Sequence, residues 1–191
     1  MVIATGIIIA IIVVVVVIVV FVLVLIGMYN SLVKLRNAVE EAFSTMDVYM
    51  KKRFDLIPNL VETVKGYAAH EKDTLERVIQ ARNFAQSAAT PEDKIQGDSQ
   101  LTGALKSLFA ISENYPQLCA NENFLNLQSQ LQNVEEDIAN SRKYYNGTVR
   151  MYNTKTEVFP SSMIAGMFKF ARKPLYEITD AAERENVKVQ F

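Results

Sequence analysis

The chain has 191 residues, which is enough for one ordinary domain with a short addition at one end. Its 20 basic and 21 acidic residues nearly cancel, and this argues against a nucleic-acid-binding protein, which usually carries a one-sided basic excess. A single cysteine excludes an internal disulfide, and one cysteine with one histidine is too few for the usual zinc sites.

The first predicted element is a membrane-spanning helix. Every residue from 7 to 26 is Ile, Val, Ala, Phe or Leu. At about 1.5 Å per residue this run covers the roughly 30 Å hydrocarbon core of a bilayer, whereas a buried strand ends after about 4–8 residues. A cleaved signal peptide is disfavoured, because residues 1–6 carry no basic side chain and residues 27–30 make a poor processing site. Residues 1–27 are therefore predicted to be a retained transmembrane anchor.

The basic residues nearest this anchor predict its orientation. All of them follow the apolar run: Lys34 and Arg36 are close to it, and Lys51, Lys52 and Arg53 lie further out. By the positive-inside rule, the domain that follows is expected in the cytoplasm. The opposite side stays open, because long domains can cross a membrane regardless of charge.

Spacings of three and four residues predict helices in the rest of the chain. One helix continues out of the membrane, and its apolar positions are Leu32, Leu35, Val39, Ala42, Phe43 and Met46. Another is marked by Leu56, Leu60, Val61, Val64, Ala68, Leu75, Val78 and Ile79. Ile57-Pro58 fits either a kink in one long helix or a turn between two helices. A turn gives four helices in up-down-up-down order with the last one returning to the membrane, whereas a kink gives three; we favour four.

Two further helices have clear signals. Thr90 offers an N-cap hydroxyl, Pro91 suits the first helical position, and this helix should end before Tyr115-Pro116. Between Cys119 and Thr156 the apolar residues follow a heptad pattern typical of a coiled coil; they are Phe124, Leu127, Leu131, Val134, Ile138, Tyr145, Val149 and Tyr152, with one gap at Ser141 and Arg142. The predicted fold is all-α: one N-terminal transmembrane helix, then an antiparallel (up-and-down) bundle of four long helices over residues 28–157.

Several stretches of the sequence resemble the signature of the LemA family. They are residues 29–37, 52–71, 123–128, 144–146 and 158–165. Phe43 stands where the family usually has tryptophan, which is a tolerable exchange of aromatic core residues. The resemblance implies a bacterial, single-pass protein of the cell (inner) membrane with a helical-bundle domain and no established activity. It also implies a membrane-bound metalloprotease as a candidate partner.

No residue is predicted to be catalytic, to bind a cofactor or to bind a metal. His70 beside Glu71 has no further histidine or cysteine partner in reach of a metal site, so a surface position on a helix is expected. The acidic run 135–137 is expected to be a solvated face. Within residues 53–61 we expect Asp55 to cap backbone N–H groups near Pro58; a partner-binding surface is the alternative.

The segment 158–191 contains the candidate contact residues. An apolar stretch is followed by basic residues, and the candidates are Met163, Ile164, Met167, Phe168, Lys169, Phe170, Arg172 and Lys173. This segment is expected either to fold back over the end of the bundle or to lie in the membrane interface, with its basic residues near anionic headgroups. Residues 163–170 are also expected to contribute contacts between copies of the chain near the membrane.

The function predicted from these features is a membrane-anchored scaffold or adaptor of the bacterial cell envelope that acts through protein contacts without catalysis. A lipid-binding or membrane-shaping protein is the alternative, and an unrecognised enzyme is less well supported. A homo-oligomer is also expected. The heptad seam from residue 124 to 152 is about 42 Å long, while the helix over residues 91–114 is about 36 Å, so part of the seam should lack an intramolecular partner.

Overall fold

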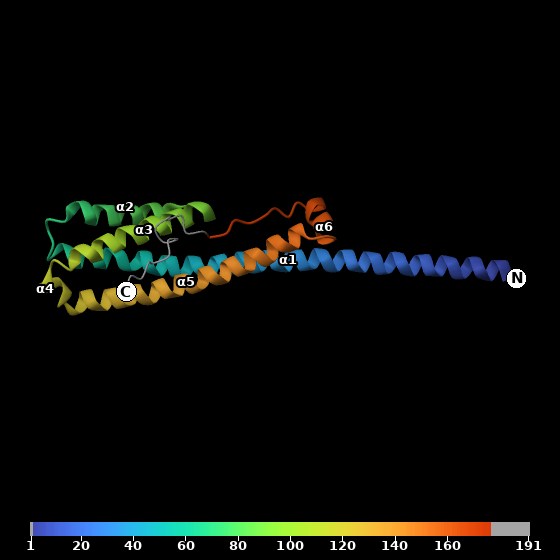
Figure 1. The fold of residues 1–191 in the computed structure, drawn as a ribbon, viewed down its shortest axis with the longest axis horizontal. Coiled ribbons are helices and arrows are strands. Elements are labelled where there is room, and N and C mark those ends of the chain that lie inside the picture. Colours follow the sequence, from blue (N-terminus) through green and yellow to red (C-terminus); the bar gives the residue numbers. More distant parts are fainter. Residues whose placement is uncertain (1, 177–191) are drawn as a thin grey trace, which may run out of the picture. The chain divides into compact units, whose positions relative to one another are not determined.

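The computed structural model describes residues 2–176, and this part of the chain is all-helical with no β-strand (Figure 1). The helices are α1 (Val2–Lys65), α2 (Lys72–Ser87), α3 (Pro91–Ser112), α4 (Pro116–Cys119), α5 (Glu122–Glu157) and α6 (Ser161–Met167). The prediction of an all-α chain that starts with an apolar helix is confirmed. Residues 177–191, which belong to the predicted C-terminal segment, lie outside the described residues.

The chain divides into two compact units. Within the described residues, the first comprises residues 2–41 and Gly147–Lys173, and the second comprises Ala42–Asn146 and residues 174–176. Both α1 and α5 contribute residues to both units.

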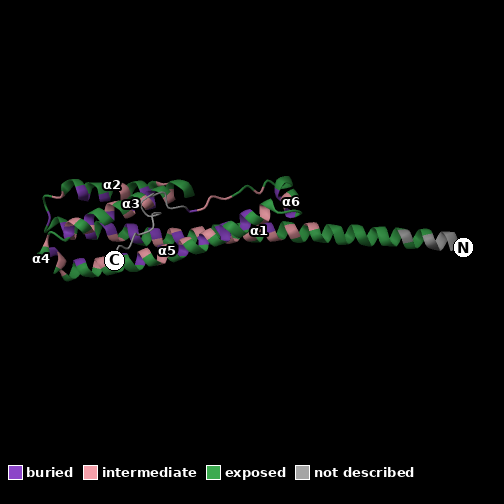
Figure 2. Ribbon diagram, viewed as in Figure 1, coloured by how far each residue is buried: buried purple, intermediate pink, exposed green. Residues whose placement is uncertain are grey.

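Helix α1 begins with the apolar run. It is long and apolar enough to cross a membrane, with a mean hydropathy of 4.1 over its most apolar 18 residues, and none of those residues is buried by the protein (Figure 2). Exposed side chains of Ile, Val, Leu and Phe in such number need an apolar environment, such as a bilayer, to remove them from water. The run is therefore suited to be a membrane anchor. The helix continues without a break beyond residue 27 to Lys65.

The expected turn at Ile57-Pro58 is wrong, because Pro58 lies inside α1. Proline has no N–H, so the carbonyl of Phe54, four residues earlier, loses its helical donor. The Nε of Arg82 on α2 donates to that carbonyl at 3.3 Å. This replacement bond lets the helix pass through Pro58, and α1 ends at Lys65 instead.

The chain turns between residues 66 and 71. The backbone N–H groups of Tyr67 and Ala68 both donate to the carbonyl of Val64, and Ala68 is buried. Helix α2 then runs antiparallel to the last part of α1, and α3 runs antiparallel to α2 (Figure 1). The apolar pattern expected for a single helix over residues 56–79 is therefore divided between α1 and α2.

The second unit has an apolar core. The side chains of Met46, Met50 and Ile57 on α1 are buried, as are Leu101, Leu105 and Leu108 on α3. Helices α2 and α3 pack closely at Gly97, where an added Cβ would come within 2.6 Å of the Cα of Ala85. The predicted N-cap is confirmed, since the Thr90 hydroxyl accepts a bond from the Asp93 N–H at 3.1 Å.

Helix α5 confirms the predicted heptad periodicity as a buried face. Seven of the eight seam residues are buried, and Leu127 is half-buried. The expectation that part of this seam lacks an intramolecular partner is therefore wrong. Both α1 and α3 contact this face, for example through Phe43 with Tyr145 and Phe109 with Phe124. The length of a single predicted helix therefore does not decide how much of the face is buried.

Candidate functional site

The first candidate site, in the first unit, is the surface formed by α6 on the early part of α1. Ile164 and Ala165 are buried against Leu32, with Leu25 and Met28 packed around them. The hydroxyl of Ser161 donates to the carbonyl groups of Lys155 and Val158 at 2.7 and 3.0 Å, and these bonds hold α6 to the end of α5.

Aromatic contacts fix the segment after α6. The Tyr29 ring lies 4.7 Å from the Phe168 ring and 5.8 Å from the Phe170 ring, measured between centroids. The guanidinium of Arg36 lies 5.5 Å above the Phe170 ring, which is cation–π distance. The apolar segment predicted as a candidate site therefore docks at the residues that directly follow the apolar run.

Several apolar side chains on α6 and beside its two ends are exposed. The exposed fractions are 65% for Met163, 72% for Met167, 54% for Phe168 and 80% for Phe159. We call Phe159, Met163, Met167 and Phe168 the α6 surface. Ile164 is buried and Phe170 is half-buried, so the predicted stretch divides into an inner and an outer side.

The three basic candidate residues differ in their partners. Lys169 is exposed, with a φ of 55°. Arg172 pairs with Glu157 at 3.4 Å, and Lys173 lies 3.9 Å from Glu40. These pairs are largely exposed and contribute little to stability.

The segment 171–176 is bound along α5 by two similar pairs of side chains. In the first unit, Asn153 accepts from the Lys173 N–H and donates to the Lys173 carbonyl, both at 2.9 Å. In the second unit, Asn146 does the same for Tyr176 at 2.8 and 2.9 Å. The tyrosine before each asparagine donates to another carbonyl of the segment: Tyr152 to Ala171 and Tyr145 to Pro174.

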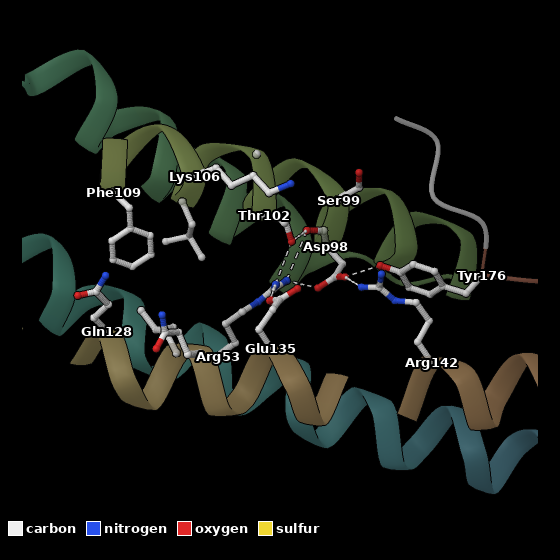
Figure 3. Close-up of a pocket in the computed structure, with 14 residues that line it drawn as sticks. Arg53, Asp98, Ser99, Thr102, Lys106, Phe109, Gln128, Glu135, Arg142 and Tyr176 are labelled. Atoms are coloured by element: carbon white, nitrogen blue, oxygen red, sulfur yellow. Dashed lines mark hydrogen bonds and ion pairs between the residues drawn. The ribbon is translucent and has the colours of Figure 1, made fainter. Parts of the chain in front are cut away.

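The second candidate site is a buried polar cluster in the second unit, which the sequence reasoning missed (Figure 3). Arg53 on α1 has 0% exposure. Its Nη1 donates to the Thr102 hydroxyl at 3.0 Å and to the Glu135 carboxylate at 2.8 Å, and its Nη2 donates to the Asp98 carboxylate. A fully buried guanidinium requires such partners, because an unpaired buried charge is very costly.

Asp98 is the common acceptor of this cluster. Its buried carboxylate also accepts from Arg142 Nη2 at 3.2 Å and from the Tyr176 hydroxyl. The Arg142 guanidinium lies 4.1 Å above the Tyr176 ring. Burial raises the pKa of the Tyr176 hydroxyl far above its ordinary value, and the Asp98 carboxylate raises it further. Tyr176 therefore stays protonated at neutral pH and acts as a hydrogen-bond donor.

Glu135 of the acidic run and Asp55 of the signature have other partners than expected. Glu135 was assigned to a solvated face, but it is half-exposed and pairs with Arg53, because α5 turns it toward α1 and α3. Asp55 was expected to cap the helix near Pro58; it pairs instead with Lys51 at 3.0 Å on the exposed side of α1. Arg53, within the same signature stretch, is buried in the polar cluster.

His70 is exposed, as expected, but it lies in the connection between α1 and α2 and not on a helix. Glu71 accepts a bond from the Tyr115 hydroxyl at 2.9 Å. Within residues 2–176, no three His, Cys, Asp or Glu side chains gather in a way that would hold a metal ion.

A sequence signal for the polar cluster did exist. Asp98 falls on the apolar face of α3, three residues after Ile95 and three before Leu101, and Arg142 falls in the gap of the heptad seam. A charged residue at a core position usually has a buried partner. Pattern alone does not say which of the many charged residues that partner is.

These features define the class of the protein: an α-helical domain that follows an apolar N-terminal helix. The chain matches the LemA family over residues 42–191, and it belongs to that family. It is similar to Protein LemA of Metamycoplasma hominis, with 27% identity over 87% of this chain and 75% of the relative. It is also similar to the magnetosome protein MamQ of Magnetospirillum gryphiswaldense and to magnetosome protein MamQ 1 of Paramagnetospirillum magneticum, each with 24% identity over 87% of this chain and 71% of the relative.

Proposed function

We propose that this protein is a membrane-anchored, non-catalytic scaffold or adaptor of the bacterial cell envelope, held at the bilayer by the apolar part of α1 and by the α6 surface. The observation that carries this proposal is the docking of α6 on α1. Ile164 and Ala165 pack on Leu32, and Phe168 packs on Tyr29, at the residues that follow the apolar run.

The position of these contacts sets the depth of α6. If residues 7–26 fill the hydrocarbon core, Tyr29 and Leu32 lie at headgroup depth, within about 10 Å of its edge. The exposed side chains of the α6 surface then lie at the same depth. An amphipathic segment with Met and Phe on one side and Lys169 and Arg172 nearby suits the interface of an anionic bilayer.

The helical part beyond this contact would present the surface for partners. We propose that residues 42–65 of α1, with α2, α3 and residues 122–146 of α5, form an up-and-down four-helix bundle. The supporting contacts are Arg82 with the Phe54 carbonyl, Gly97 with Ala85, and Arg53 with Glu135.

Membership of the LemA family is compatible with a non-catalytic role. A cytoplasmic side for this bundle remains the proposal made from the basic residues after the span.

The lipid-binding or membrane-shaping alternative also draws support from the α6 surface. The two proposals differ in what the segment does after it binds. A scaffold uses α6 to hold its domain at the bilayer and leaves the membrane curvature unchanged. A membrane-shaping protein changes the curvature of the vesicles that contain it.

The absence of tryptophan from the sequence allows a direct test of depth. A single tryptophan is introduced by Phe168→Trp, Tyr29→Trp or Val48→Trp, and the full chain is reconstituted into vesicles that contain brominated phospholipids. Val48 is exposed and lies about 20 residues, or roughly 30 Å, beyond Gly27 along α1. Bromine should quench the fluorescence at positions 168 and 29 and leave position 48 unaffected.

Unquenched emission from position 168, together with quenching at position 29, would overturn the interfacial role of α6. The segment would then only close the first unit. Vesicle size measured by electron microscopy before and after reconstitution separates the scaffold from the membrane-shaping alternative.

A further inference from the structure

The second unit contains a cavity of about 460 Å³, lined by residues of α1, α3 and α5 and by Tyr176 (Figure 3). This volume is in the range of small-molecule sites. The lining has a polar part, with Arg53, Asp98, Thr102 and Glu135, and an apolar part that consists of Leu105, Phe109 and Leu131. Glu135 has a 43% exposed side chain, so the polar part reaches solvent.

Two buried donors in this lining have no acceptor among residues 2–176. They are the Nε groups of Arg53 and Arg142, which are inaccessible. Arg53 is completely buried, and buried donors of this kind almost always have a partner. The guanidinium groups of this cluster therefore carry donors that Asp98 and Glu135 do not satisfy.

The charges of the lining also favour an anion. Arg53, Lys106 and Arg142 contribute three positive charges, and Asp98 and Glu135 contribute two negative charges. Asp98 is fully buried and accepts hydrogen bonds from Arg53, Arg142 and Tyr176, so its carboxylate stays in place. Glu135 is the carboxylate that can move, because its side chain is half-exposed and it contacts the cluster through Arg53.

We propose that this cavity binds a small organic acid whose carboxylate replaces Glu135 at the Arg53 guanidinium and whose apolar group lies on Leu105, Phe109 and Leu131. The ligand carboxylate would accept from Nη1 of Arg53, which donates to Glu135 in its absence. Arg53 is bonded to Thr102, and Phe109 lies seven residues further along α3, which is about 10 Å. The ligand is therefore about 10 Å long from its carboxylate to the far end of its apolar group.

The test uses 4-phenylbutyrate, which has this length, with its neutral analogue 4-phenylbutyramide as the probe without charge. Binding to the full chain in detergent micelles is measured by isothermal titration calorimetry, with empty micelles subtracted. Saturable binding of the acid and at least tenfold weaker binding of the amide are expected. Equal binding of the two compounds, or no saturable binding of the acid, would overturn the proposal.

Glu135→Gln separates a ligand site from a purely structural ion cluster. It removes the internal competitor and leaves the Arg53–Asp98 pair, so 4-phenylbutyrate should bind about tenfold more tightly. Glu136→Gln, at the exposed neighbouring position, is the matched control and should leave the affinity unchanged. Phe109→Ala should weaken binding about tenfold, with circular dichroism showing a folded chain. An affinity that is no tighter in Glu135→Gln would overturn the proposal; the scaffold function does not depend on either result.

Discussion

At the scale of single residues, the cluster around Asp98 is the feature with the largest electrostatic consequence. Two guanidinium groups and one phenol bind one buried carboxylate. Removing these charges from water costs free energy. Their mutual attraction offsets this cost only if every member of the cluster is present. The cluster therefore specifies how α1, α3 and α5 pair within the second unit more than it adds net stability.

Removing the central charge should be strongly destabilising. Asp98→Asn keeps the size of the side chain but leaves Arg53 and Arg142 without their shared anion, at a cost of about 3–5 kcal/mol. For a chain of this length, that corresponds to a melting temperature lower by about 10 °C, measured by circular dichroism on the full chain in micelles.

Asp55→Asn provides the control for this prediction, because Asp55 pairs with Lys51 at an exposed position. Its cost should be about 0.5 kcal/mol or less. If the two variants melted at the same temperature, the buried cluster would not be a determinant of the fold.

At the scale of helices, the continuity of α1 depends on a bond from another helix. Pro58 removes the N–H that would bond to the Phe54 carbonyl, and Arg82 on α2 supplies the replacement donor. A helix that contains proline is thus coupled to the helix that follows it.

A double-mutant cycle tests this coupling. Arg82→Met should cost about 1–2 kcal/mol in the natural sequence, because it leaves the Phe54 carbonyl without a donor. In the Pro58→Ala background the N–H of residue 58 is restored, so the same change should cost much less. The two costs are measured by chemical denaturation. Additive effects would show that Arg82 contributes by packing alone.

At the scale of the whole molecule, the first unit has two groups of exposed apolar residues, the apolar run and the α6 surface. The apolar run on α1 suits a bilayer, and the α6 surface lies beside the end of that run. Self-assembly remains a proposal. The heptad seam no longer supports it, since those residues are buried, and the α6 surface is the better candidate for contacts between copies.

Light scattering coupled to size-exclusion chromatography should detect this assembly. The full chain in micelles at tens of micromolar should have the mass of a dimer or larger oligomer. Replacing Met163, Met167 and Phe168 by serine should lower that mass, while Val48→Ser, also at an exposed apolar position, should not. A monomeric natural chain at this concentration would contradict self-assembly outside the membrane.

The sequence by itself determined the features that depend on neighbouring residues. The apolar run, the N-cap at Thr90 and the heptad face of α5 were all predicted from it, because hydrophobic periodicity and capping act over a few residues. Only the tertiary structure decided the rest. The helix passes through Pro58 because of Arg82, Arg53 is buried because of Asp98, and α6 is oriented by its contact with Leu32. Each of these pairs is separated by more than 20 residues, and no local pattern specifies which distant side chain will meet an unpaired carbonyl, a buried charge or an apolar face.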